Sequence, residues 1–195
     1  MYALSGDDAK PGVRENQEMA LDAEQKRVAT GILGAVALSA IVLAAGYFFY
    51  PFAQRPLTTA GDRVAFALKA DLFLFLWLAF AIGRVATGRF FSPADIAGSG
   101  FAAPGQAIAF RSAFLQNTLE QVVLAFGAHL GLAVVLRGFE LVLIPAAVVL
   151  FCIGRLAFLV GYARGAGARS FGFATTFYPS VFLLVLAILL FLIRG

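Results

Sequence analysis

The sequence is poor in charged, sulfur-containing and metal-binding side chains. Only 13% of its 195 residues are charged, and it has one cysteine and one histidine. The lone Cys152 excludes an intrachain disulfide and a thiolate metal site. The lone His129, set among glycine, alanine and leucine, is predicted to be a packed or hydrogen-bonded residue rather than a metal ligand. The chain also lacks a Ser/His/Asp set, a glycine-rich phosphate loop and a metal-ligand cluster, which argues against the chemistries that depend on them.

Apolar residues make up most of the chain. They account for 61% of it, and the mean hydropathy is +0.88. A soluble domain is about 45–50% apolar and about 25% charged. A chain of this length has room for one domain, and its apolar content exceeds what a water-soluble core can bury. The composition therefore predicts an integral membrane protein, in contact with membrane lipid.

Five apolar runs are long enough to cross a bilayer, since a helical span needs about 20 residues. The sequence has no strand signal and no tandem repeat. We therefore predict an all-α protein in three parts, with 1–27 as a polar N-terminal tail, 28–50 as an uncleaved additional transmembrane helix and 63–195 as a four-helix membrane domain. The spans within that domain are predicted at 63–83, 106–136, 140–162 and 173–193.

The distribution of lysine and arginine predicts the orientation, because basic residues are enriched on the cytoplasmic side. The arginines stand singly at the ends of apolar runs and form no patch for nucleic acid. The more basic side of the predicted membrane carries Lys26, Arg27, Arg84, Arg89, Arg111, Arg164 and Arg169. The opposite side carries Arg55, Arg63, Arg137 and Arg194. We therefore expect a cytoplasmic N-terminus, with the C-terminus on the opposite side.

The third span carries polar residues at membrane depth. A carboxylate there costs a few kcal/mol or more, so Glu120 must face protein or water. At about 100° per residue, Asn117, Glu120 and Gln121 share one helix face, with Gln116 on its shoulder. Arg111 lies about 120° away on the same wheel. The third span is therefore the first place to look for function.

The fourth span offers a partner for this carboxylate. Arg155 and Tyr162 are seven residues apart and so lie on one stripe of a helix. Because a guanidinium presents a fork of donors that matches a carboxylate, we expect Arg155 to pair with Glu120. Arg84, at the end of the second span, is the competing partner.

These polar residues have two interpretations. In one they are interhelical glue, with each hydrogen bond contributing about 0.6–2 kcal/mol. In the other they line a pocket open to the cytoplasm, whose arginines suit an anionic ligand that carries carboxylates. On the second span, Lys69 and Asp71 do not share a face and are expected at the interface or paired to other helices.

Two stretches resemble the family of membrane-associated proteins in eicosanoid and glutathione metabolism (MAPEG). The segment 116–120, Gln-Asn-Thr-Leu-Glu, is similar to the Asn-x-x-Glu of the family's second helix. The segment 161–164, Gly-Tyr-Ala-Arg, resembles the link between its third and fourth helices, and Arg169 and Tyr178-Pro179-Ser180 follow it. The resemblance covers 63–195 and implies a four-helix bundle assembled as a homotrimer, with glutathione bound between subunits.

The resemblance also implies roles for individual residues. Arg169 matches the arginine that stabilises the glutathione thiolate, the catalytic role. With the neighbouring polar residues included, the expected glutathione-binding set is Asn117, Glu120, Tyr162, Arg155, Arg84 and Gln116. No metal is expected. The chain departs from the family pattern at Ala113, Leu115, Gln121 and Phe158. The family usually has arginine at the first of these positions, a polar residue at the second and often tyrosine at the third, and its leukotriene-type members have tyrosine at the fourth.

Three functions follow as hypotheses. The leading one is a glutathione-dependent transferase or peroxidase acting on lipophilic electrophiles. The alternative is a non-catalytic assembly or lipid-binding subunit of the same fold, which gains from Ala113 and from the additional first helix. A proton or ion pathway through Glu120 is disfavoured, because only this carboxylate is expected well inside a span and a relay needs a chain of titratable groups.

Overall fold

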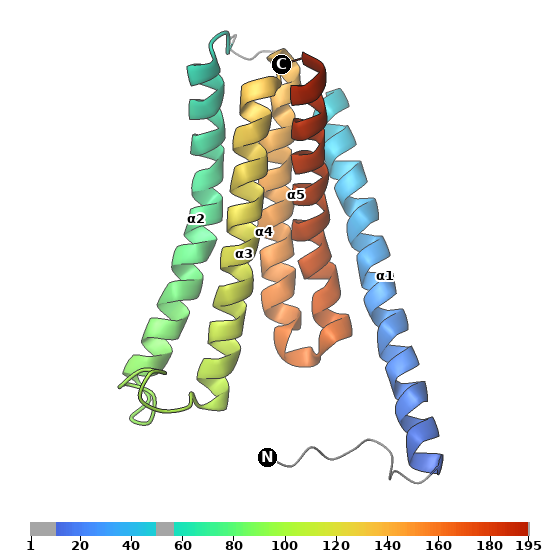
Figure 1. The fold of residues 1–195 in the computed structure, drawn as a ribbon, viewed down its shortest axis with the longest axis vertical. Coiled ribbons are helices and arrows are strands. Elements are labelled where there is room, and N and C mark those ends of the chain that lie inside the picture. The colour runs from blue at the N-terminus through green and yellow to red at the C-terminus, as the bar shows by residue number, and fades with distance from the viewer. Residues whose placement is uncertain (1–10, 50–56, 195) are drawn as a thin grey trace.

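The computed structural model describes residues 11–49 and 57–194, and within them every regular element is a helix (Figure 1). The helices are α1 (Pro11–Phe49), α2 (Ala60–Phe90), α3 (Gln106–Val135), α4 (Leu143–Gly161) and α5 (Ala166–Arg194), with short 3-10 turns η1 (Gly138–Val142) and η2 (Tyr162–Arg164). Five helical segments are long and apolar enough to cross a membrane. The chain is therefore an all-α, multi-pass integral membrane protein, as predicted. Its orientation in the membrane stays a prediction.

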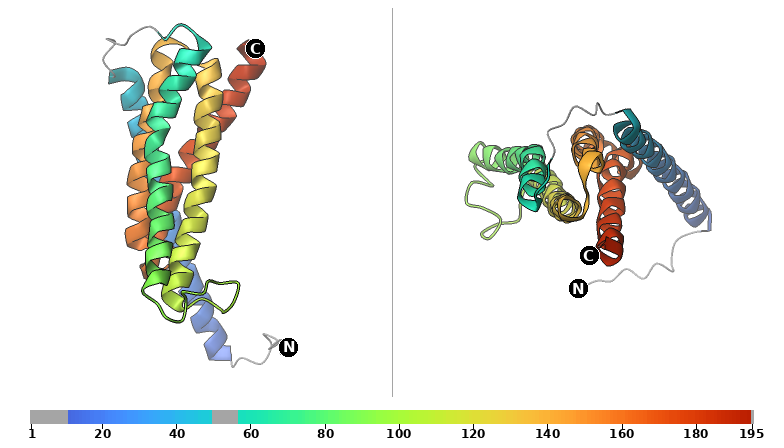
Figure 2. Two further views of the ribbon diagram at one scale, coloured as in Figure 1. Left: turned by 90° about the vertical axis from the view of Figure 1, so that its left-hand side faces the viewer. Right: turned by 90° about the horizontal axis from the view of Figure 1, so that it is seen from above.

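Helices α2 to α5 form a bundle, and α1 lies on its outside (Figures 1 and 2). Helix α1 packs along α5 and over a shorter length of α4, while α2 packs on α3 and both α3 and α4 pack on α5. The first residue of α1 and the last of α5 lie at opposite ends of the molecule (Figure 1). The four-helix bundle therefore has a fifth helix along one flank.

The core of the bundle consists of three clusters of buried apolar side chains. One cluster contains Leu132 and Leu183, and the second is built around Leu74 and Phe151. The third contains Phe114 and Phe158, with aromatic side chains packed against it. That third cluster lies next to the candidate site described below.

Several helices extend beyond their predicted limits. Helix α1 begins at Pro11 and is continuous into its apolar run, so residues 11–27 are not a separate tail; residues 1–10 and Tyr50 lie outside the described part. Helix α2 runs on to Phe90, and α5 begins at Ala166. The predictions were short because an apolar window marks the hydrocarbon thickness, whereas the helical hydrogen bonds continue into the polar interface.

Glycines bring α4 and α5 into backbone contact. A methyl group added at Gly161 would collide with the Ala168 carbonyl group, and one added at Gly172 would collide with the backbone of Phe158. One added at Gly154 would lie 2.9 Å from the Gly172 carbonyl oxygen. Small residues at such positions allow membrane helices to approach closely. The polar residues on the facing sides of α4 and α5 are therefore brought together.

A buried pair of titratable side chains joins α2 to α3. The Nδ1 atom of His129 lies 2.6 Å from Oδ1 of Asp71, and these side chains are 1% and 0% exposed. Asp71 is thus paired to another helix and is not interfacial, and it is a second carboxylate, besides Glu120, within a candidate membrane span. His129 is hydrogen-bonded, as predicted. Within residues 11–49 and 57–194, no group of three or more His, Cys, Asp or Glu side chains is placed to hold a metal ion.

We predict that His129→Leu destabilises the protein by about 1–3 kcal/mol, because the buried Asp71 carboxyl group loses its hydrogen-bond partner. The double variant Asp71→Val/His129→Leu removes both polar groups and is expected to recover most of that loss. Thermal unfolding in detergent micelles compares the two variants. An unfolding temperature of the single variant equal to that of the wild-type protein would contradict the prediction.

Candidate functional site

A cleft of about 450 Å³ lies beside the turn from α4 to α5. Its polar lining consists mainly of Asn117 from α3, Tyr162 from η2 and Arg169 from the first turns of α5. The ring of Phe173 and apolar residues of α1 complete its wall. Three of the predicted site residues, separate in the sequence, therefore meet at one cavity.

The turn that carries two of these residues depends on glycine. Gly165 has φ +101°, a conformation that residues with a side chain rarely adopt. It is the only residue between η2 and α5, so the chain reverses within a single non-helical residue. This short reversal sets Arg169 over Tyr162, with the guanidinium carbon 5.2 Å from the ring centroid.

Arg155 lies behind the cleft and holds Asn117 in place. Its side chain is fully buried and lies 4.6 Å from the ring centroid of Phe158. Its Nη1 donates to Oδ1 of Asn117 at 2.9 Å, and its Nη2 donates to Oγ1 of Thr176 at 3.0 Å. Because the amide oxygen of Asn117 accepts from Arg155, its NH₂ group is the part left to donate. This arrangement turns a neutral amide donor toward the cleft.

The cleft has an excess of positive charge. Neither Arg155 nor Arg169 makes an ion pair within residues 11–49 and 57–194. Glu24 of α1 approaches the first turn of α5, but its carboxylate accepts from the backbone N–H of Gly167 at 2.7 Å. An anionic ligand would therefore supply a counter-charge that the described chain does not.

The predicted pairing of Glu120 with Arg155 is wrong. Glu120 is exposed, and its Oε1 accepts from Nε2 of Gln116 one turn earlier at 2.9 Å. Position 120 is rotated about 60° from position 117 around α3. Of these two residues, only Asn117 is bonded to Arg155 of α4. Gln121, expected on the same face as Glu120, is buried. Neither Gln116 nor Glu120 lines the cleft in the single chain.

Arg84 belongs to a second, smaller cavity. This cavity, of about 220 Å³, is lined by Arg84, Arg111 and Phe114 on the other side of Tyr162. The Arg84 guanidinium carbon lies 5.9 Å from the centroid of the Phe114 ring, and its carbonyl accepts from Nη1 of Arg111 at 2.9 Å. The structure therefore places Arg84 neither in the larger cleft nor beside Glu120.

The sequence analysis missed two site residues on α5. Phe173 lines the cleft, and Thr176 accepts the second hydrogen bond from Arg155. Both follow Arg169 at helical spacings of four and seven residues, so they share its face. That periodicity was the available signal. It was lost because the glycine-rich stretch before Phe173 was expected to be a link rather than helix.

We predict that Thr176→Val destabilises the protein by about 1–3 kcal/mol, because Nη2 of the buried Arg155 loses its acceptor. Thr175→Val is the matched control. It also removes a buried hydroxyl, but one that donates only to the Phe171 carbonyl of its own helix. Chemical or thermal unfolding measures both variants. Equal effects would contradict a specific role for Thr176.

Comparison with protein-family models matches residues 64–189 to the MAPEG family. Searches of the curated proteins and of the solved structures find no match. The matched range covers nearly all of α2 to α5, includes Asn117, Tyr162 and Arg169, and leaves α1 outside. Because this range is well over half of the sequence and contains the residues that meet at the cleft, the chain belongs to the MAPEG family.

Proposed function

We propose that this protein is a glutathione-dependent transferase or peroxidase that acts on lipophilic electrophiles in the membrane. The carrying observation is the cleft in which the family's motif residues converge, with two guanidinium groups near it and no paired carboxylate among the described residues. Glutathione carries two carboxylates and a thiol, so its charge complements this site. Membership of the family supports the same assignment.

In this proposal, Asn117 and Tyr162 hold the tripeptide. The NH₂ group of Asn117 donates to a glutathione carboxylate, since its oxygen is already bound to Arg155. The hydroxyl of Tyr162 is a second donor at the same cleft. Arg155 contributes positive charge from behind and fixes the direction of the amide, which makes it a positioning residue.

Arg169 has the catalytic role in the proposal. A cation beside a thiol lowers the thiol pKa from about 8.5 toward neutrality, and the thiolate is the nucleophile. In a transferase reaction the thiolate sulfur forms a bond to the electrophilic carbon, and the leaving group departs with its electron pair. In a peroxidase reaction it attacks the hydroperoxide and releases the alcohol. A second glutathione then converts the sulfenic acid to glutathione disulfide and water.

The alternative is a non-catalytic, lipid-binding member of the family. Phe158 favours it, because the site has a packed aromatic ring where leukotriene-type relatives carry tyrosine, and the hydroxyl is absent. This alternative and the enzyme proposal differ in one requirement. Only the enzyme needs Arg169 for its role in the cell.

We also propose that the protein assembles as a homotrimer. Glu120 lies near the middle of α3, with its carboxylate on the exposed surface of the single chain. Exposure of a carboxylate to lipid costs a few kcal/mol or more. Coverage of this surface by further copies of the chain removes that cost. It also brings Gln116 and Glu120 to a subunit boundary, where the family binds glutathione.

Arg169→Ala is expected to lower the rate of glutathione conjugation at neutral pH by about 10–100-fold, because the thiol pKa rises back toward its ordinary value. Arg164→Ala, in η2 before the reversal at Gly165 and exposed, is the matched control and should retain activity. Thiolate absorbance of the complex and isothermal titration with glutathione separate ionisation from binding. Absence of glutathione binding to the wild-type protein at millimolar concentration would reject the enzyme proposal.

Glu120→Leu tests the proposed assembly. If α3 forms a subunit boundary through Glu120, the substitution weakens the trimer, because the polar contacts across the boundary are lost. If the residue faced lipid, the same substitution would stabilise the single chain. Sedimentation in detergent, combined with thermal unfolding, distinguishes these outcomes, and a wild-type protein that sediments as a monomer would contradict the proposal.

A further inference from the structure

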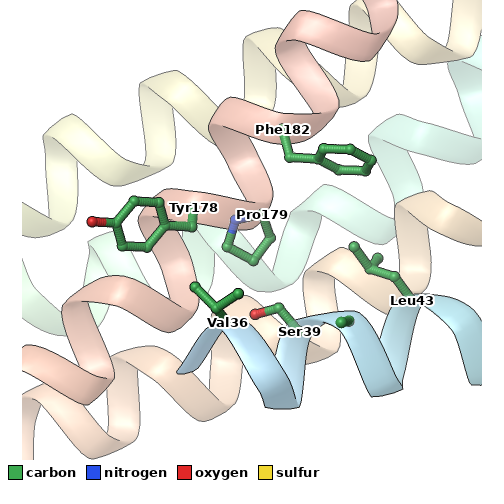
Figure 3. A pocket seen from close by; sticks show the side chains of 7 residues that line it. Val36, Ser39, Leu43, Tyr178, Pro179 and Phe182 are labelled. Carbon is green, nitrogen blue, oxygen red and sulfur yellow. The ribbon is translucent and has the colours of Figure 1, made fainter. Parts of the chain in front are cut away.

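Helix α1 lies outside the family match, yet it lines two successive cavities. Val28 and Ile32 form part of the wall of the cleft described above. Farther along the same helix, Val36 and Leu43 face α5 across another cavity, of about 340 Å³, which we call the α1–α5 cavity (Figure 3). The spacings of four and seven residues put these four side chains on one stripe of α1. The two cavities therefore follow one another along the seam between α1 and α5.

The contact between α1 and α5 is close over much of its length. The backbone N–H of Gly167 donates to the Glu24 carboxylate at 2.7 Å in the first turn of α5. A Cβ atom added to Gly31 would lie 3.3 Å from Cβ of Ser170. Near the other end of α1, a Cβ added to Gly46 would lie 3.2 Å from that of Ala146 on α4. Glycine at such positions is typical of tightly associated membrane helices. Helix α1 is thus a fixed wall of both cavities.

The α1–α5 cavity is suited to a hydrocarbon chain. The side chains of Pro179 and Phe182 complete its apolar lining (Figure 3). The Ser39 hydroxyl donates its proton to the Ala35 carbonyl at 2.7 Å, so that proton is not available to a ligand. The Tyr178 hydroxyl points away from the other labelled side chains (Figure 3). An apolar cavity of this size fits the tail of an amphipathic molecule.

We propose that the seam between α1 and α5 binds the hydrocarbon part of the electrophile. This inference rests on the proposed function, since it assigns the substrate class to the same site. The alkyl chain occupies the apolar cavity between α1 and α5, and the reactive end enters the adjoining cleft beside Arg169. For an alk-2-enal, the glutathione thiolate bonds to the β-carbon and the electron pair moves to the carbonyl oxygen. The α-carbon then takes a proton from water.

The kinetic test compares a short and a long alk-2-enal, crotonaldehyde and dodec-2-enal, with the full chain in lipid nanodiscs. Val36→Trp fills the cavity from α1, and Leu33→Trp adds the same side chain at a position 70% exposed that lines neither cavity. We expect Val36→Trp to lower kcat/KM for dodec-2-enal about tenfold, equivalent to withdrawing roughly two methylene groups from the cavity. The value for crotonaldehyde and the affinity for glutathione should not change. Equal effects of the two tryptophans, or no loss with Val36→Trp, would overturn the proposal.

Photolabelling tests the cavity without glutathione. A dodec-2-enal bearing a diazirine on its alkyl chain should label α1 and α5 around Val36 and Phe182, and unlabelled dodec-2-enal should compete. Competition by phospholipid would identify a membrane acyl chain as the occupant and overturn the proposal. If the wild-type protein is labelled in this way but binds no glutathione, the enzyme proposal is rejected, whereas the assignment of the cavity to a hydrocarbon chain is retained.

A disulfide tests whether α1 is docked as described. In a Cys152→Ala background, Gly46→Cys/Ala146→Cys, which joins α1 to α4, should cross-link, because the two Cβ positions are 3.2 Å apart, close to the usual disulfide range of about 3.5–4.5 Å. Gly131→Cys/Ala187→Cys, whose Cβ positions are 3.4 Å apart within the four-helix bundle, is the matched control. If only the control pair cross-links, α1 does not form a wall of either cavity, and the inference is overturned.

Discussion

A guanidinium group in the middle of apolar helices constrains this bundle. Arg155 on α4 is fully buried, and the described chain offers it no carboxylate. Its acceptors come from neighbouring helices, Asn117 on α3 and Thr176 on α5, and its cation lies on the ring of Phe158. A buried charge is costly unless hydrogen bonds compensate it, so these contacts restrict how the three helices rotate and slide against one another. The same contacts orient the amide that faces the cleft.

Close approach of α4 and α5 makes this arrangement possible. Gly161 and Gly172 let the two backbones touch, and Gly165 reverses the chain in one residue. As a result Arg169 enters the cleft from the first turns of α5, beside Tyr162 from η2. The arginine that fixes the geometry of the site and the arginine that is accessible to a ligand thus come from different helices. Buried Arg155 sets the geometry, and half-buried Arg169 is left accessible to a ligand.

Much of the fold was readable from the sequence, because bilayer thickness imposes long apolar runs. The site was readable in part. Asn117, Tyr162 and Arg169, which the sequence analysis proposed as site residues, line one cleft, whereas the predicted partner of Arg155 was wrong. That choice depends on the rotation of α3 against α4, which a single helical wheel does not determine. The pairing of Asp71 with His129 depends in the same way on how α2 meets α3, since the residues are far apart in sequence. The contribution of α1 to the cleft could not be predicted from the family motifs, because these motifs lie in α3 to α5.

The number of spans has a practical consequence. Four helices return a chain to the side from which it started, whereas the fifth helix leaves the beginning of α1 and the end of α5 at opposite ends of the bundle (Figure 1). Arg194, the last residue of α5, donates to the Glu140 carboxylate at the end of the bundle away from the turn at Gly165. A fluorescent protein or affinity handle fused after Arg194 would therefore sit in the compartment across the bilayer from the cleft. Immobilising the protein through that handle leaves the mouth of the cleft free for ligands in solution.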